Sequence, residues 1–272
     1  MMIKRTAISL GLLGLLAIGC ADGTEEVGSN TAAITHGTLD GNAHPAVVLL
    51  LMEVDGQPAF RCSASLLSPT VVLTAGHCAG EPGEFSGMRV FTEAAVDGGN
   101  NNYPFAGPNS VEAVSWQAHP QFTEAAFALH DVGVVILKSP GVVLPASAYV
   151  KLPGTNQLDA LQPRSSTVFT AVGYGVQRIN AAKTEAVRIR MRANPHLVQI
   201  NTGFTGSFSL LLSNNASSGG TCFGDSGGPN FVGDSLVVGG VTSFGLNGSC
   251  GGTGGVFRVD RPDVLAFVKS FL

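Results

Sequence analysis

The sequence predicts an all-β protein, and composition together with the spacing of apolar runs supports this fold class. Of the 272 residues, 36 are glycine, which is about twice the usual share of glycine. Charged residues make up 12%, which is about half their usual share. A mean hydropathy of +0.28 argues against disorder, and so few charges argue against long charged helices. Short β-branched runs recur between turns rich in Gly, Pro, Asn and Ser, as expected for strands. The length allows one or two domains with a core of their own.

Eight apolar runs are predicted to form strands. They cover residues 46–51, 71–73, 132–137, 168–172, 187–191, 209–212, 236–241 and 255–259. Many short strands joined by glycine-rich turns are typical of barrels or sandwiches. The clearest helix is C-terminal, because Val264, Leu265 and Val268 follow helical spacing. Asp260 is expected to cap this helix, and Pro262 to lie in its first turn.

The first twenty residues are predicted to be an export signal. Lys4 and Arg5 precede an apolar run over residues 8–18, which is shorter than the ~20 residues that span a bilayer. Residues 17–20, Ala-Ile-Gly-Cys, resemble a bacterial lipobox in which Cys20 is lipidated, although residues 19–21 also fit an ordinary cleavage site. We therefore expect an exported bacterial protein, either secreted or anchored by lipid in the outer envelope. Residues 21–33 are interpreted as a pro-segment or tether.

The cysteine count agrees with export. The five cysteines are Cys20, Cys62, Cys78, Cys222 and Cys250. In an oxidising compartment the last four can form two disulfides, which leaves Cys20 unpaired. The net charge is −4 and no basic cluster occurs, so nucleic acid is not an expected partner.

Three separated segments carry residues suited to acyl transfer. Residues 73–78 contain His77, residues 130–137 contain Asp131, and residues 222–229 contain Ser226. Each segment alone is unremarkable. Together, in the order His, Asp, Ser, they can supply a base, an orienting carboxylate and a nucleophile. An α/β-hydrolase has the order Ser, Asp, His, which disfavours an esterase of that fold.

These segments resemble the chymotrypsin/trypsin family of serine endopeptidases. Residues 173–175 (Gly-Tyr-Gly), 243–245 (Ser-Phe-Gly) and 255–257 (Gly-Val-Phe) extend the resemblance, which covers about residues 34–272. It implies a fold of two packed antiparallel β-barrels with a C-terminal helix. We expect the first barrel at about 34–145, the second at about 146–260, and the helix at about 261–272.

The resemblance also implies a role for each reacting residue. His77 would accept the proton of Ser226 as that residue attacks the peptide carbonyl, and Asp131 would orient the imidazole. The backbone N–H groups of Gly224 and Ser226 would form the oxyanion hole.

Two disulfides follow from the same resemblance: Cys62–Cys78 beside the base, and Cys222–Cys250 beside the nucleophile. The neighbouring His77 and Cys78 could instead indicate zinc. However, no Cys-x₂-Cys or His-x₃-His spacing accompanies them, so no metal and no cofactor are expected.

Activation by cleavage is a further implication of the resemblance. The new amino group of Ile34 would pair with Asp225 and shape the oxyanion hole, which makes the full chain a zymogen. The cut would follow Ala33, so an activator that cleaves after basic residues is not expected.

The specificity pocket is read from positions that match the family pattern. They are Gly220, Thr221, Ser243, Phe244, Gly245 and Gly255. Gly220 would form the base of the pocket and carries no charge to pair with Arg or Lys. Gly245 and Gly255 would leave the walls open. We therefore expect a preference for large apolar or aromatic side chains before the scissile bond.

The expected partners are protein or peptide substrates and an inhibitor. Membrane contact is expected only through a lipid at Cys20, and the protein is expected to be a monomer. The alternative is a catalytically silent, protease-like binding module. The chain keeps His77, Asp131, Ser226 and Gly224, which disfavours this alternative.

Overall fold

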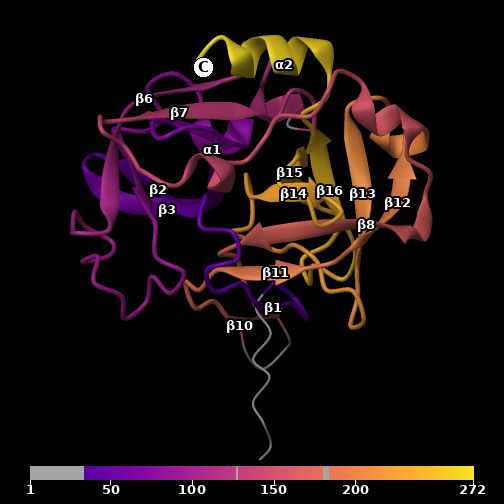
Figure 1. The fold of residues 1–272 in the computed structure, drawn as a ribbon, viewed down its shortest axis with the longest axis horizontal. Helices are drawn as coiled ribbons and strands as arrows, with labels where there is room; N and C mark the ends of the chain where they lie inside the picture. Colours follow the sequence, from indigo (N-terminus) through magenta and orange to yellow (C-terminus); the bar gives the residue numbers. More distant parts are fainter. Residues whose placement is uncertain (1–33, 127, 180–183) are drawn as a thin grey trace, which may run out of the picture. The chain divides into compact units, whose positions relative to one another are not determined.

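The computed structural model describes residues 34–126, 128–179 and 184–272 (Figure 1). The predicted signal peptide, the pro-segment and Cys20 lie outside the described residues. Within that part of the chain, no helix is long and apolar enough to cross a membrane.

The first barrel is built from six antiparallel strands, drawn in indigo to magenta in Figure 1. Its strands are β2 (Val47–Val54), β3 (Gln57–Leu66), β4 (Val71–Thr74), β5 (Gly87–Phe91), β6 (Ser110–Ala118) and β7 (Gly133–Leu137). They close in the order β2-β3-β4-β7-β6-β5. The residues of β2 are buried from Val47 to Met52, so this strand forms the centre of the barrel core.

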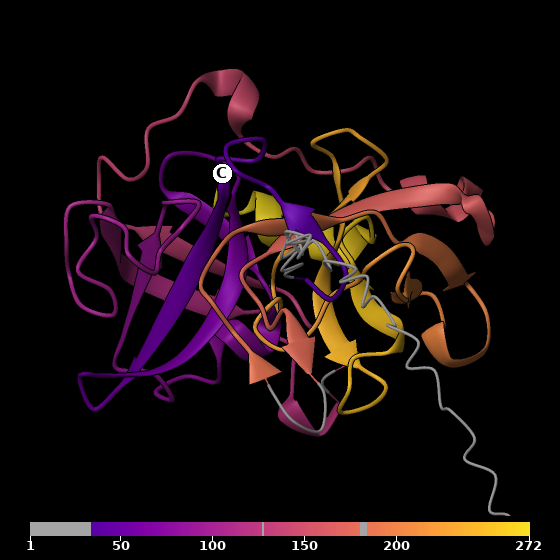
Figure 2. The same cartoon turned by 90° about the horizontal axis from the view of Figure 1, so that it is seen from below.

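A second barrel follows, drawn mainly in orange and yellow (Figures 1 and 2). Its strands are β8 (Arg164–Gly173), β12 (His196–Ile200), β13 (Ser209–Asn214), β14 (Pro229–Val232), β15 (Val238–Gly245) and β16 (Gly252–Arg258). They run in the order β8-β12-β13-β16-β15-β14, and a pairing of β14 with β8 closes the ring. The strand β11 (Met191–Ala193) pairs with β8, and β1 (Thr38–Leu39) pairs with β11. A separate hairpin joins β9 (Arg178–Ile179) to β10 (Thr184–Glu185).

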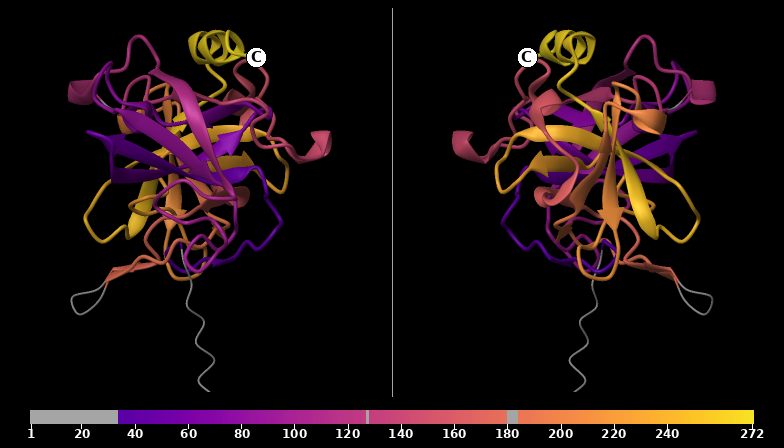
Figure 3. Two further views of the ribbon diagram at one scale, coloured as in Figure 1. Left: turned by 90° about the vertical axis from the view of Figure 1, so that its left-hand side faces the viewer. Right: turned by 90° about the vertical axis from the view of Figure 1, so that its right-hand side faces the viewer.

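Helices are short in the described part of the chain. They are α1 (Gly76–Ala79), the 3₁₀ turns η1 (Glu124–Ala126), η2 (Ala146–Ala148), η3 (Gln157–Ala160) and η4 (Gly203–Thr205), and the C-terminal α2 (Pro262–Lys269). Helix α2 buries Val264, Leu265 and Val268 against the largest core cluster. It lies next to β6 and β7 of the first barrel (Figures 1 and 3), where the rings of Phe267 and His119 are 5.1 Å apart.

The structure confirms the predicted fold class of two antiparallel barrels with a C-terminal helix. Five strands of the two barrels were not predicted, namely β3, β5, β6, β12 and β14, and neither were the short strands β1, β9 and β10. In β6, for example, Glu112, Ser115 and Gln117 interrupt the apolar pattern because most of the strand is exposed or half-buried.

Three local expectations were wrong. The predicted strand at 187–191 is irregular up to Arg190, and the observed strand begins at Met191. Asp260 does not cap α2, because its buried carboxylate binds the guanidinium of Arg258 and the backbone N–H of Leu158. The start of the predicted first barrel pairs with the second sheet, through β1 and β11.

Candidate active site

His77 and Asp131 meet at one end of the first barrel. Helix α1 begins directly after β4 and carries His77, while Asp131 precedes β7, the partner of β4. The Nδ1 atom of His77 lies 3.0 Å from Oδ2 of Asp131, and its backbone N–H donates to Oδ1 at 2.9 Å. The register of β4 and β7 therefore brings together two residues that are 54 positions apart.

The second barrel adds a further contact to this pair. Ser243 lies near the end of β15 and donates its hydroxyl hydrogen to Oδ2 of Asp131. Asp131 is completely buried and accepts hydrogen bonds from both barrels. A buried carboxylate with several donors keeps a defined orientation, which in turn orients the His77 ring.

The environment of His77 favours its protonated form. Burial alone would lower the pKa of the imidazole, but the hydrogen bond to Asp131 and the charge of that carboxylate outweigh it, so the pKa is raised above 6.5. The side chain is still about one-quarter exposed, so a substrate can reach its free nitrogen. This combination suits a group that accepts a proton during a reaction.

Ser226 lies in the tight loop between Cys222 and β14. Its carbonyl oxygen accepts a hydrogen bond from the backbone N–H of Ser63 in β3, which holds the loop against the first barrel. Gly224 has a φ of +91°, a conformation that residues with a Cβ rarely adopt, and its carbonyl oxygen accepts the hydroxyl of Ser63. Within the described residues, no hydrogen bond joins His77 to Ser226.

Asp225 lies in a buried cradle next to Ser226. It accepts backbone hydrogen bonds from Gly175 at 2.8 Å and from Cys222 at 2.9 Å. A Cβ on Gly175 would lie 2.5 Å from the Asp225 carboxylate, so only glycine allows this approach. Burial raises the pKa of Asp225 to about 7, although both backbone hydrogen bonds act to lower it.

Ile34, the expected partner of Asp225, packs against the second barrel, but it forms no ion pair with Asp225. Ile34 is completely buried and packs with Met191 and Ala193. In the full chain its nitrogen belongs to a peptide bond, and in the described residues Asp225 has no cationic partner. The next residue, Thr35, accepts a hydrogen bond from the backbone N–H of Gly220. Its hydroxyl lies within hydrogen-bond distance of the Gly220 carbonyl oxygen and donates to Oδ1 of Asn214 at 2.6 Å.

A buried ion pair ties the segment after Ile34 to the same cradle. The Nε atom of Arg190 donates to Oδ2 of Asp40 at 3.1 Å, and its Nη1 donates to the hydroxyl of Tyr174 at 3.1 Å. Tyr174 lies between Gly173 and Gly175, which both approach the Asp225 carboxylate, and its backbone N–H donates to the hydroxyl oxygen of Ser63. Burial raises the pKa of the Tyr174 hydroxyl to about 12, so it stays a neutral donor and acceptor.

A pocket of about 210 Å³ lies beside Ser226. It is lined by Thr221, Cys222, Phe223, Ser226, Thr242, Ser243, Phe244, Gly245 and Cys250. Among the described residues, no charged side chain lines it. The disulfide Cys222–Cys250 forms one wall, and the second disulfide, Cys62–Cys78, lies next to His77. Both disulfides are those that were expected.

Two residues expected in the pocket do not line it. Gly220 is buried below Thr221 and contacts Thr35 and Asn214. Gly255 faces the ring of Phe244, which would clash with a Cβ there. Its neighbour Gly254 faces Thr221: a Cβ on Gly254 would lie 2.8 Å from the hydroxyl oxygen of Thr221. Neither glycine is among the residues that line the pocket.

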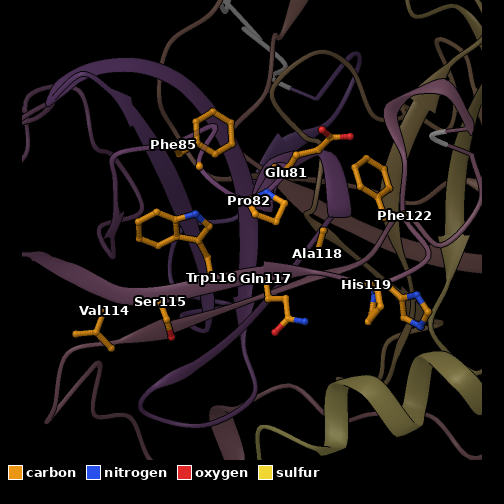
Figure 4. Close-up of a pocket in the computed structure, with 13 residues that line it drawn as sticks. Glu81, Pro82, Phe85, Val114, Ser115, Trp116, Gln117, Ala118, His119 and Phe122 are labelled. Atoms are coloured by element: carbon orange, nitrogen blue, oxygen red, sulfur yellow. The ribbon is translucent and has the colours of Figure 1, made fainter.

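Two other features of the described residues resemble ligand sites, namely a group of possible metal ligands and a larger pocket. The cluster Cys62, His77 and Cys78 has atoms within 4.8 Å of one another, but both sulfurs are bonded in the disulfide and cannot act as thiolate ligands. A larger pocket of about 470 Å³ lies between residues 80–85 and β6, where Phe85, Trp116 and Phe122 border it (Figure 4). None of the predicted site residues lines that pocket.

Comparison with known proteins agrees with this geometry. The sequence profile of the Trypsin family matches residues 38–264, which is most of the chain. The chain belongs to the trypsin family of serine endopeptidases.

Individual relatives cover most of this trypsin-family chain. Brachyurin from Leptuca pugilator is 28% identical over 219 residues, which is 78% of this chain and 85% of brachyurin. Trypsin iota from Drosophila melanogaster is 24% identical over 195 residues, 68% of each protein. The solved structure of HL collagenase has the same fold, with a TM-score of 0.67 at 20% identity over 87% of this chain and 97% of that chain. The two relatives named by species are arthropod proteins, so they lend no support to the expected bacterial source.

Proposed function

We propose that this trypsin-family endopeptidase uses Ser226 as its nucleophile, His77 as its general base and acid, and Asp131 as the residue that orients His77. The observation that carries this proposal is the hydrogen-bonded pair of His77 and the buried Asp131, because Asp131 also binds Ser243, which lines the same pocket as Ser226. Hydrogen bonds at such sites are often long or absent in the free enzyme and form when the substrate binds.

The proposed reaction has two steps. The Oγ of Ser226 bonds to the peptide carbonyl carbon, and its proton passes to Nε2 of His77. The carbon–nitrogen bond then breaks, and His77 gives that proton to the leaving amine. Water releases the acyl group by the same route. The N–H groups of Gly224 and Ser226 would stabilise the oxyanion, and loss of one such donor typically costs about 3–4 kcal/mol.

Replacing the nucleophile tests the assignment. Ser226→Ala should abolish hydrolysis of peptide anilides in the chain trimmed to Ile34. Thermal unfolding should change little, because Ser226 holds the loop through its backbone carbonyl. A phosphonate probe should label wild type at Ser226. If the trimmed protein is folded but takes up no probe, the binding-module alternative is favoured.

Substrate preference is the second part of the proposal. The pocket beside Ser226 has an uncharged lining with Phe223 and Phe244, which supports a large apolar or aromatic residue before the scissile bond. Matched anilides ending in Phe, Leu, Arg and Glu test this preference. Faster hydrolysis after Arg would contradict it.

Activation and export complete the proposal. Asp225 is buried and has no cationic partner among the described residues, which supports a zymogen that is completed when cleavage frees the amino group of Ile34. Two disulfides fit an oxidising compartment outside the cytoplasm. We propose protein substrates, an inhibitor as a further partner, and a monomeric state. Sequencing the mature N-terminus tests the cut, and Cys20→Ser followed by membrane fractionation tests the lipid.

A further inference from the structure

A cation without a partner lies beside the Ser226 loop. The Nε atom of Arg61 is buried and has no hydrogen-bond partner among the described residues. It lies 3.9 Å from the position that a Cβ on Gly224 would take. Arg61 as a residue is half-buried, so the rest of its guanidinium can be reached by a group from outside the protein.

Arg61 borders a hollow separate from the proposed specificity pocket. This hollow of about 440 Å³ is lined in part by Phe60, Arg61, Tyr103 and Arg188, and it shares no lining residue with the pocket beside Ser226. Phe223 lines the pocket beside Ser226, and the next residue, Gly224, approaches Arg61. A peptide whose acyl half fills the first pocket can therefore extend its leaving half toward Arg61.

The backbone of β3 is open at this point. The N–H of Ser63 points away from β2 and donates to Ser226, whereas the N–H of Leu66 donates to Ala46 on the other side. Because bonding direction alternates along a strand, the N–H and C=O of Arg61 point the same way as those of Ser63. Strand β4 pairs with β3 only at Ser65 and Leu66. The edge at Arg61 can therefore accept an extended peptide as an added strand.

The same alternation determines where the Arg61 side chain lies. The side chain of Arg61 lies on the same face of β3 as that of Ser63, whose hydroxyl donates to the carbonyl oxygen of Gly224. At roughly 3.3 Å per residue, Arg61 lies about 7 Å from Ser63 along the strand. An extended peptide covers that distance in about two residues, which is within the first three residues after the scissile bond.

The charge at this edge of the cleft is positive. Arg188 also borders the hollow, but it pairs with Asp97 at 3.4 Å, and the backbone N–H of Arg188 donates to the same carboxylate. Arg61 forms no ion pair with any described residue. A substrate carboxylate would therefore find one uncompensated guanidinium here.

We propose that Arg61 selects substrates with Asp or Glu among the first three residues after the scissile bond. This proposal rests on the proposed peptidase function. Arg61 would act as a specificity residue by pairing with the substrate carboxylate while its backbone holds the leaving half in extended form. The ligand must therefore be a peptide that carries a carboxylate. The carboxylate pairs with the guanidinium of Arg61, and the peptide backbone pairs with the open edge of β3.

The test uses internally quenched peptides with one acyl half that ends in Phe. Glu, Gln or Lys is placed at each of the three positions after the scissile bond, and kcat/KM is measured with trimmed enzyme. The ratio of kcat/KM for Glu to that for Gln should reach roughly fivefold at one position. It should fall toward one at about 1 M NaCl, because salt screens an exposed pair.

Variants separate recognition from general damage, because a ratio within one variant cancels any overall loss of activity. Arg61→Gln should bring the ratio to about one, Arg61→Lys should retain part of it, and Arg61→Glu should favour the Lys peptide. The matched control Arg164→Gln, at an exposed arginine of β8, should keep the wild-type ratio.

Two failures are distinguishable. An anilide with the same acyl half has no residues to contact Arg61, so it measures the peptidase function by itself. If wild type does not hydrolyse that anilide, both proposals are overturned. If it does, but the Glu-to-Gln ratio is flat at all three positions or survives in Arg61→Gln, only the role of Arg61 is overturned.

Discussion

The hydroxyl of Ser243 donates a hydrogen bond to Oδ2 of Asp131, so a strand of the second barrel holds the carboxylate that orients His77 in the first. Ser243 was expected only as a pocket residue. Its position links the wall of the pocket to the orientation of the proposed base, because one side chain takes part in both.

Removing this hydroxyl should weaken catalysis without destroying it. A hydrogen bond to a charged group contributes about 1.5–3 kcal/mol, so Ser243→Ala should lower kcat roughly tenfold or more. The freed carboxylate should hold a proton on His77 more tightly and move the acidic limb of the pH–rate profile to higher pH. Ser243→Thr keeps a hydroxyl and serves as the control. A profile that does not move in Ser243→Ala would contradict this coupling.

The pH dependence of activity should reflect His77. Its pKa is raised above 6.5, and the reaction needs the neutral imidazole, so kcat/KM should rise with pH through an apparent pKa above 6.5. The same shift stabilises the fold when His77 is protonated. That contribution is complete below pH 6.5 and is lost as pH rises through the folded pKa.

Titration of the His77 ring by NMR in Ser226→Ala checks the pKa directly. Adding Asp131→Asn removes the charged carboxylate that binds the His77 ring. Burial then remains as the main influence on the His77 pKa, so this pKa should fall. An unchanged value in the double variant would mean that Asp131 does not set the protonation of His77.

Cleavage before Ile34 should change how stability depends on pH. In the full chain the pKa of Asp225 is about 7, above its ordinary value of 3.8, so the folded state binds a proton that the unfolded state releases. The free energy of unfolding should therefore fall as pH rises from about 4 to 7. In the trimmed chain the new ammonium group should lower the Asp225 pKa and remove this loss.

Urea unfolding of Ser226→Ala in full-length and trimmed forms measures the difference. Asp225→Asn should flatten the pH dependence of the full-length form. If both forms lose stability equally over this range, Ile34 does not pair with Asp225 after cleavage.

The buried ion pair between Arg190 and Asp40 should be important for stability. Arg190→Met leaves Asp40 buried with only His44 as an ionisable partner, and breaking such a pair costs about 3–5 kcal/mol. Arg192→Met, at an exposed position of β11, is the matched control and should have little effect. The double variant Asp40→Asn, Arg190→Met should recover part of the loss, because it removes the isolated charge. Equal unfolding midpoints for the two arginine variants would contradict the prediction.

Much of the fold and of the candidate site could be predicted from short segments. Runs such as 71–73 and 132–137 are apolar on consecutive residues because they are buried, so they are visible without coordinates. Strands such as β6 were missed because much of their surface faces solvent and their side chains show little pattern. The disulfide partners followed from resemblance, and the structure contains both.

Other features depend on contacts between distant segments. Gly220 has the position of a pocket residue in the linear pattern, yet Thr35, 185 residues away, packs against it and Gly220 lies outside the lining. Gly255 likewise lies outside the lining, because the pairing of β15 with β16 places it against the ring of Phe244. No local rule could have predicted either result.

The sequence alone determined which chemical groups are present and in what order, since His77, Asp131, Ser226 and the glycine before Asp225 each lie in a short distinctive segment. Only the tertiary structure decided that Ser243 holds Asp131, that Asp225 is completely buried, and that Arg61 lies near Gly224 in the Ser226 loop. The reason is physical: residue type is local, whereas burial and hydrogen bonding depend on which strands of the two barrels come into contact.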